Sequence, residues 1–215
     1  MSGGSRFRAL GALARMGDPT AKSLYGRMLA NGTIGGVFLP DYQDSELAVA
    51  MLDTVKTTDP AAAVALGLLL ASGDGADRDM AAARSLFGSW PNYPEARYRL
   101  GLMKMFGLGG AVDLGGAFSD IEWAANRSSG GVPQAMAMAT AGRSYFLGRG
   151  CAVNYQWAYI WLERAKMYPS YFLSLDLLKA NAEAARVALI SVGIDPVRTL
   201  YYFNRPPQWN GPIPV

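Results

Sequence analysis

The chain has 215 residues, of which 51% are hydrophobic and 17% are charged, and its formal net charge is +3. This composition excludes an intrinsically disordered protein, and the scattered basic residues exclude the concentrated positive surface of a nucleic-acid-binding protein. No apolar run is long enough to predict a transmembrane segment, and no secretory signal is predicted at the N-terminus. The single cysteine, Cys151, excludes internal disulfides and indicates a reducing compartment, so we expect a cytoplasmic protein.

Four glycines recur along the chain in the same local setting. Each is preceded by an alanine five residues earlier and followed by a second glycine six residues later. The leading glycines are Gly26, Gly67, Gly101 and Gly142, and the following ones are Gly32, Gly73, Gly107 and Gly148. The leading glycines lie 41, 34 and 41 residues apart. Self-similarity at this period predicts stacked helical hairpins. Positions within each repeat are numbered from its leading glycine, which is position zero.

Each leading glycine is predicted to lie inside the first helix of a hairpin. Small or apolar residues at positions minus five, minus one, zero and plus three form one helical stripe. A glycine inside a helix costs about 1 kcal/mol relative to alanine, a cost that close approach of a neighbouring helix would explain. The glycine at plus six is predicted to end the helix in a left-handed conformation. Both sets of glycines are therefore interpreted as structural.

A second helix is predicted after each first one. Asp79, Asp113 and Asn154 stand at position plus twelve and are good N-cap residues. Alanines recur at plus sixteen, namely Ala83, Ala117 and Ala158. Repeat one carries an insertion at residues 37–43, before a second helix predicted at about 44–56. Removing this insertion brings Ala48 into register with the other alanines.

These elements predict four repeats, at about residues 17–56, 58–90, 94–127 and 133–167. A capping helix is expected at 170–192 to cover the apolar end of the stack. Its apolar side is predicted to comprise Leu173, Leu177, Ala184, Val187 and Ile190. Residues 1–192 would then form one solenoid domain. Residues 193–215 are expected to form an extended tail, because residues 200–215 hold four prolines and four aromatic residues. This tail either packs on its own solenoid or docks on a partner.

Residues suited to catalysis or metal binding are scarce. The chain has no histidine, which removes the commonest general base and zinc ligand. Cys151 has no activating base nearby in the sequence, and Asp74, Asp77 and Asp79 lack the spacing of a calcium loop. The glycine runs follow no predicted strand, so they are not phosphate loops. Glu122 and Glu163 are the remaining acid–base candidates and are interpreted as solvated or ion-paired. We expect no catalytic residue, cofactor or metal.

The repeat pattern resembles that of the Sel1-like repeat family, a branch of the tetratricopeptide-like α-solenoids. Repeat four matches the family pattern best, through Gly142, Tyr145, Gly148, Gly150, Asn154, Tyr155, Ala158, Trp161 and Ala165. Repeat one is degenerate, since the usual Gly-x-Gly is Gly32-Thr33-Ile34. The resemblance covers about residues 17–167. It implies an all-α, right-handed α–α superhelix of about four hairpins with a C-terminal capping helix and an extended tail.

The same resemblance implies a non-enzymatic scaffold or adaptor, of bacterial type, that binds a partner protein or peptide on its concave face. Two alternatives stay open: a permanent subunit of a larger, membrane-associated complex, and a β-lactam hydrolase. The hydrolase-linked relatives carry a cysteine pair in each repeat, which this chain lacks. Candidate contact residues lie where the repeats differ and in the tail. They are Arg27, Arg99, Lys104, Phe106, Arg143, Ser144, Tyr202, Phe203 and Trp209.

Overall fold

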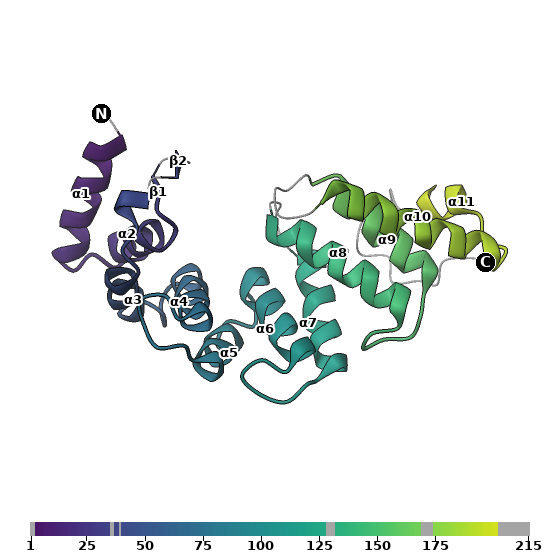
Figure 1. Ribbon diagram of the computed structural model, residues 1–215, viewed down its shortest axis with the longest axis horizontal. Coiled ribbons are helices and arrows are strands. Elements are labelled where there is room, and N and C mark those ends of the chain that lie inside the picture. Colours follow the sequence, from purple (N-terminus) through teal and green to yellow (C-terminus); the bar gives the residue numbers. More distant parts are fainter. Residues whose placement is uncertain (1–2, 35–36, 39, 128–131, 169–173, 202–215) are drawn as a thin grey trace. The chain divides into compact units, whose positions relative to one another are not determined.

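The computed structural model describes residues 3–34, 37–38, 40–127, 132–168 and 174–201, and they form two compact units. The first unit contains α1 to α5 and the segment 108–110, and the second contains most of α6 and the elements from α7 to α11 (Figure 1). Among the helices of these residues, none combines the length and apolar composition that crossing a bilayer requires.

The first unit consists of helices, one short hairpin and a 3-10 turn. Its elements are α1 (Gly3–Arg15), α2 (Pro19–Asn31), β1 (Thr33–Ile34), β2 (Val37–Phe38), η1 (Pro40–Tyr42), α3 (Ser45–Asp53), α4 (Pro60–Ser72) and α5 (Met80–Gly88). Successive helices pack against each other, and α2 also packs against α4, so first helices of neighbouring repeats lie side by side. The core between them includes Phe7, Tyr25, Leu29, Leu52 and Leu66.

The second unit is helical throughout its described residues. Its elements are α6 (Pro94–Phe106), α7 (Leu114–Arg127), α8 (Val132–Leu147), α9 (Tyr155–Lys166), α10 (Leu175–Ser191) and α11 (Pro196–Tyr201). Helix α8 packs against α7 and α9, and α9 packs in turn against α10 (Figure 1). The core of this unit includes Tyr98, Ile121, Trp161, Leu162 and Leu189.

The second helices begin at the predicted caps. The carboxylate of Asp79 accepts a hydrogen bond from the backbone N–H of Ala82 at 2.8 Å, and the side-chain oxygen of Asn154 accepts one from Trp157 at 3.0 Å. Asp113 accepts one from the N–H of Gly116 at 2.8 Å. Each bond satisfies a donor that has no partner within the helix itself. The caps therefore set where each hairpin turns back.

The leading glycines lie where the two helices of a hairpin touch. A Cβ atom added to Gly67 would lie 2.6 Å from the Phe87 ring, and one on Gly142 would lie 2.8 Å from Leu162. Gly26 faces Leu52 and Gly101 faces Ile121 in the same way. The alanines at plus sixteen are fully buried, including the one that follows the insertion; they are Ala48, Ala83, Ala117 and Ala158. Small residues on both helices thus bring the paired helices close together.

Glycines at positions plus six and plus eight shape the turns between the paired helices. The glycines at plus six have positive φ angles of 57° to 84°; they are Gly32, Gly73, Gly107 and Gly148. Gly75, Gly109 and Gly150, at plus eight, also have positive φ. They lie against the backbone at the start of the preceding repeat's second helix. A Cβ on Gly150 would lie 2.0 Å from the Leu114 carbonyl oxygen, and one on Gly109 would lie 2.1 Å from that of Met80. These turns therefore pack directly on the previous hairpin.

The two ends of the chain differ from the sequence prediction. Helix α1 was not predicted, because its glycines weaken its local helix signal; Phe7 stabilises it by packing on Tyr25, with ring centroids 4.9 Å apart. After Gly193, where an extended path was expected, α11 forms instead. Its N-terminus is capped by Asp195, whose carboxylate accepts a hydrogen bond from the N–H of Val197 at 2.8 Å.

The predicted apolar side of the capping helix was also wrong. In α10 the buried residues are Leu178, Ala182, Ala185 and Leu189, whereas Leu177, Val187 and Ile190 are 52 to 53% exposed and Ala184 is exposed too. Leu173 lies outside the described residues. Helix α10 has apolar residues on two sides, so its sequence alone did not reveal which side meets α9.

Candidate functional site

A groove in the first unit lies along the first helices of repeats one and two. It has a volume of about 470 Å³. Its lining comes from α2 (Arg27, Ala30, Asn31), from α4 and the residues after it (Ala61, Val64, Ala65, Leu68, Leu69, Ser72, Asp74) and from the segment before and at the start of α6 (Tyr93, Glu95). The groove follows α2 and α4, which pack side by side.

The apolar part of this groove is supplied by α4. Leu68 is 37% exposed although it lies within a helix that is apolar on all sides. Val64 precedes it by one helical turn, and Ala61 and Ala65 leave room beside them. An exposed leucine flanked by alanines forms a shallow apolar hollow. Such a surface suits an apolar side chain of another protein.

Polar groups border the apolar part. The Arg27 Nε donates a hydrogen bond to the Ser23 carbonyl oxygen at 3.4 Å. This bond keeps the guanidinium group close to α2. Tyr93 is half-buried, and burial together with the charge of Glu95 raises the pKa of its hydroxyl. The hydroxyl therefore stays protonated near neutral pH and is able to donate a hydrogen bond. The groove offers apolar contact in the middle and polar contacts around it.

Asp59 joins the two helices beneath the groove. It caps α4 by accepting a hydrogen bond from the N–H of Ala61 at 2.8 Å, and it also accepts one from the hydroxyl of the buried Ser23 on α2. Burial alone would raise the pKa of Asp59, but the hydrogen bonds from Ser23, Ala61 and Ala62 and the charge of Arg27 lower it. Asp59 is thus a fixed anion that orients α2 against α4.

The described candidate contact residues of the sequence analysis are divided between the two units. Arg27 lines the groove of the first unit. Lys104 lies in the second unit, where its Nζ is 2.7 Å from an oxygen of Asp120. Asp120 is only 6% exposed and also accepts a hydrogen bond from Arg97 Nε at 2.8 Å. Lys104 therefore belongs to an ion-pair network that holds α6 to α7.

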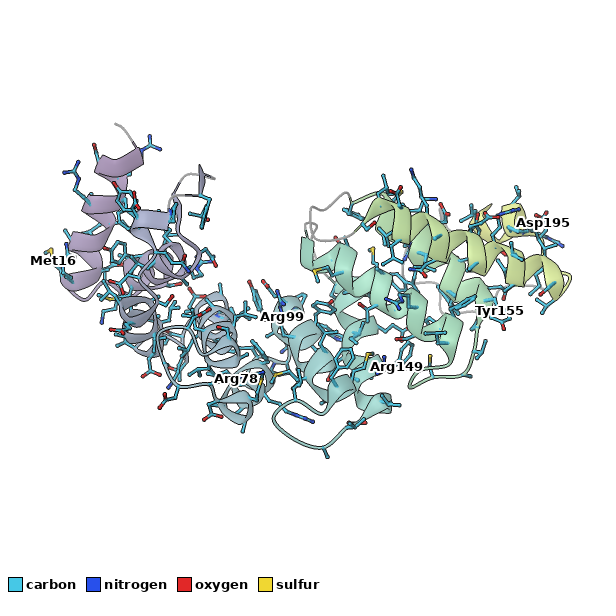
Figure 2. The ribbon with its side chains drawn as sticks, in the orientation of Figure 1. Met16, Arg78, Arg99, Arg149, Tyr155 and Asp195 are labelled. Carbon is cyan, nitrogen blue, oxygen red and sulfur yellow. The ribbon has the colours of Figure 1, made fainter. Side chains whose placement is uncertain are left out.

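The other described candidates have mixed surroundings. Phe106 is 56% exposed, with the guanidinium of Arg149 5.1 Å from its ring centroid, and Arg143 is exposed on α8. Ser144 is buried, so it offers no contact surface. Arg99 is half-buried on α6, in the second unit (Figure 2). Tyr202, Phe203 and Trp209 lie outside the described residues.

Sequence reasoning missed most of the groove. Val64, Leu68 and Ser72 stand at positions minus three, plus one and plus five of repeat two. Arg27 and Asn31 stand at plus one and plus five of repeat one, on the corresponding side of the neighbouring helix. The equivalent positions of repeats one and two therefore indicated the groove residues in the sequence. Comparing the same positions in adjacent repeats, rather than choosing polar outliers, would have found the groove.

A half-buried polar cluster in the second unit accounts for Cys151 and Glu122. The Tyr145 hydroxyl donates to Glu122 Oε1 at 2.5 Å, and its ring packs edge-on against Phe118. Burial, the hydrogen bond to Glu122 and the charge of that carboxylate raise the pKa of Tyr145. Burial and Glu122 also raise the pKa of Cys151, which favours the thiol over the reactive thiolate. This cluster joins α7 of repeat three to α8 of repeat four rather than activating a nucleophile.

The remaining acidic candidate is also paired. Glu163 accepts from Lys166 Nζ at 2.8 Å, one helical turn away. Within the described ranges, no group of three or more histidine, cysteine, aspartate or glutamate residues is placed to hold a metal ion.

Comparison with known proteins gives the fold. No model of a protein family and no curated protein matches the sequence. The structure is similar to a Sel1 repeat protein from Oxalobacter formigenes, with a TM-score of 0.61, 20% identity and coverage of 86% of this chain and 71% of that chain. It is also similar to a protective antigen present in uropathogenic Escherichia coli strains that displays an SLR fold (TM-score 0.64, 18% identity). That match covers 92% of this chain and 44% of the antigen, so the chain spans less than half of the antigen's length. The chain therefore has the all-α, Sel1-like repeat fold that its glycine register predicted.

Proposed function

We propose that this protein is a non-enzymatic scaffold that binds a segment of a partner protein in the groove between α2 and α4. The observation that carries the proposal is the exposed Leu68, which lies among small residues and is bordered by Arg27, Asn31 and Tyr93. Repeat solenoids commonly bind partners along their first helices, and the Sel1-like fold supports the same use here.

The chemistry of the groove indicates what kind of segment it holds. An aliphatic or aromatic side chain would bury the exposed surface of Leu68. The Arg27 guanidinium and the Tyr93 hydroxyl would donate hydrogen bonds to backbone carbonyls or to a carboxylate of the same segment. Asp74 and Glu95, also at the groove, disfavour a second acidic residue nearby. The partner segment is therefore expected to be apolar with at most one acidic group.

A substitution within the groove tests this proposal. The Leu68→Glu variant places a carboxylate in the apolar hollow and should weaken partner binding about 10- to 100-fold, as expected from losing the burial of one leucine side chain. The measurement is quantitative affinity purification from the native source, followed by calorimetry with the enriched partner. Leu13→Glu is the matched control, because Leu13 is an exposed leucine on α1 outside the groove.

The proposal requires that partners bound by the wild type and by Leu13→Glu are lost with Leu68→Glu. Equal recovery with both variants would exclude the groove as the binding site. Thermal unfolding followed by circular dichroism checks that both variants fold.

A second candidate is a permanent subunit of a larger complex. It is favoured by Phe106 and Leu147, which stand at position plus five of repeats three and four and are 56 and 61% exposed. Apolar residues at equivalent exposed positions of one unit are typical of a surface that a subunit covers. An isolated chain that is soluble and monodisperse in light scattering would count against this function.

A further inference from the structure

The first unit holds a second hollow, which is built around the insertion of repeat one. It has a volume of about 540 Å³, within the range of about 300–1,000 Å³ that is usual for ligand sites. Its lining comes from α1, α2, the insertion, the start of α3 and the turn of repeat two. We name it the insertion pocket. Insertions in repeat arrays often lie on the face that binds a partner, so this pocket is a candidate site.

Contacts on two sides give the insertion pocket its shape. The backbone N–H of Asp44, directly after the insertion, donates a hydrogen bond to the Leu29 carbonyl oxygen near the end of α2 at 3.2 Å. Toward repeat two, a Cβ atom added to Gly75 would lie 2.3 Å from the Ser45 carbonyl oxygen. The turn of repeat two therefore packs directly on the start of α3, and the pocket lies where repeats one and two meet.

Three aromatic side chains contribute to the lining. They are Phe7, Tyr25 and Tyr42, and the ring centroid of Phe7 lies 4.9 Å from that of Tyr25 and 5.1 Å from that of Tyr42. Phe7 and Tyr25 are buried, whereas Tyr42 is 40% exposed, so part of its ring is accessible to a ligand. The face of an accessible aromatic ring attracts a cation.

The charged residues of the lining are all acidic. They are Asp41, Asp44 and Glu46, and none of them makes an ion pair with another residue of the described ranges. The carboxylate of Asp44 is held in place, because it accepts a hydrogen bond from the N–H of Leu47 at 3.0 Å. A carboxylate can accept further hydrogen bonds, and like charges near one another repel. A cation in the pocket would therefore be stabilised by both the carboxylates and the aromatic ring.

An arginine side chain meets both requirements. Its planar guanidinium stacks on aromatic rings, and its five N–H donors match the geometry of carboxylates. A metal ion fits less well. In the part of the chain that the structure describes, Asp41, Asp44 and Glu46 belong to no group that is placed to hold one. An uncharged apolar side chain would contact the aromatic rings but leave the carboxylates without a partner.

We propose that the insertion pocket binds an arginine side chain of a partner protein. The guanidinium stacks against the ring of Tyr42 and donates hydrogen bonds to the carboxylates of Asp41 and Glu46. This inference is independent of the groove between α2 and α4, because the two sites share no lining residue.

A titration of the full chain, labelled with nitrogen-15 and followed by amide NMR signals, tests the proposal. The probe is N-acetyl-arginine N-methylamide, which represents an arginine within a polypeptide. Its neutral counterpart of nearly the same shape is N-acetyl-citrulline N-methylamide. The arginine probe should shift the signals of residues 41–47 with a Kd of about 1–10 mM, as expected for a small ligand. The citrulline probe should bind about fivefold more weakly or worse, because it lacks the charge.

Two variants assign the binding to the pocket. Glu46→Gln removes one carboxylate charge, and Tyr42→Leu removes the aromatic ring but keeps an apolar side chain. Each should raise the Kd of the arginine probe about threefold. Asp53→Asn is the matched control, because Asp53 is an exposed acidic residue of α3 that does not line the pocket, and its Kd should equal that of the wild type. The unshifted signals of the remaining residues check that each variant folds.

Several results would overturn the proposal. Equal affinity for the arginine and citrulline probes would exclude recognition of the charge. No saturable shift at residues 41–47, or the same Kd for the wild type and both pocket variants, would exclude the pocket. Tighter binding of free arginine than of the blocked probe would identify a site for a small molecule rather than for a partner protein. Shifts confined to the signals of α4 would place the probe in the groove instead.

Discussion

Repeat one and the later repeats form the same hairpin, but their turns differ at one position. In repeats two, three and four, position plus eight is a glycine that lies on the backbone of the preceding second helix. In repeat one the position is Ile34, which lies in β1 and pairs with Val37 of β2. The element before repeat one is helix α1, which packs against α2 and also contacts β1. The departure of repeat one from the family pattern thus accompanies a different turn, in which β1 pairs with β2 and contacts α1.

Repeat one is attached to its neighbours by other contacts. Phe7 of α1 packs on Tyr25 and, edge-on, on Tyr42 of the insertion, with ring centroids 4.9 and 5.1 Å apart. Toward repeat two, the Ser23 hydroxyl donates to Asp59. The glycines at position plus eight thus mark contacts between neighbouring repeats, whereas the leading glycines mark contacts between the two helices of one repeat.

The largest expected effect is at the glycine between repeats. Gly150→Ala would force a Cβ to within 2.0 Å of the Leu114 carbonyl oxygen at a residue with a φ of +80°. We expect a loss of about 3 kcal/mol in the free energy of unfolding, from overpacking and left-handed strain together. Urea denaturation measures it. Gly193→Ala is the control, because Gly193 has a φ of +77° but no atom within 4 Å of an added Cβ, so about 1 kcal/mol is expected. Equal losses would remove the distinction between repeat one and the later repeats.

The next effect concerns the contact within a hairpin. Gly67→Ala would place a Cβ 2.6 Å from the buried ring of Phe87, and should cost about 1–3 kcal/mol. Gly88→Ala is the matched change in α5, where nothing lies within 4 Å of the new Cβ. It should stabilise the protein by about 0.5–1 kcal/mol through its higher helix propensity. Thermal unfolding of both variants gives the sign of each effect, and a stabilised Gly67→Ala would contradict close helix approach.

The smallest effect is at the contact that joins repeat one to repeat two. The pKa of Asp59 is lowered below its ordinary value of 3.8, so its charge stabilises the fold above that pH. This stabilisation is lost as the pH falls through the lower pKa of the folded state. Asp59→Asn should therefore cost about 1 kcal/mol or less at pH 7 and nothing near pH 2, since asparagine still caps a helix.

Unfolding of wild type and variant at the two pH values checks the prediction for Asp59. Asp53→Asn serves as the control, because the carboxylate of Asp53 is 57% exposed in its pair with Lys56. A pH-independent difference at Asp59 would show that the charge is not what joins the helices.

Much of the fold was predictable because its determinants are local. The N-caps Asp79 and Asn154 and the glycines that end the first helices act within a few residues of their own position. Helix α1 was not predictable in this way, since Phe7 is stabilised by Tyr25, eighteen residues along the chain. The buried side of α10 was likewise decided by α9, as both sides of its sequence are apolar.

The candidate site was less predictable than the fold. Polar outliers on first helices were expected to form the contact surface, but Lys104 is held by Asp120 and Ser144 is buried. A side chain's partner in the fold decides whether it is available, and a sequence does not give that partner. Leu68, by contrast, was not among the predicted contact residues, although it is accessible and lines the groove.

The glycine at position plus eight also has a consequence for where further repeats can be added to the stack. Repeats two, three and four each carry, in their own turn, a glycine that fits against the hairpin before it. A new hairpin can therefore be appended downstream if it brings its own glycine. Addition of repeats by duplication should accordingly be tolerated on the C-terminal side of a repeat that carries this glycine. Each such glycine contact is also a separate nearest-neighbour coupling in the unfolding of the repeat array.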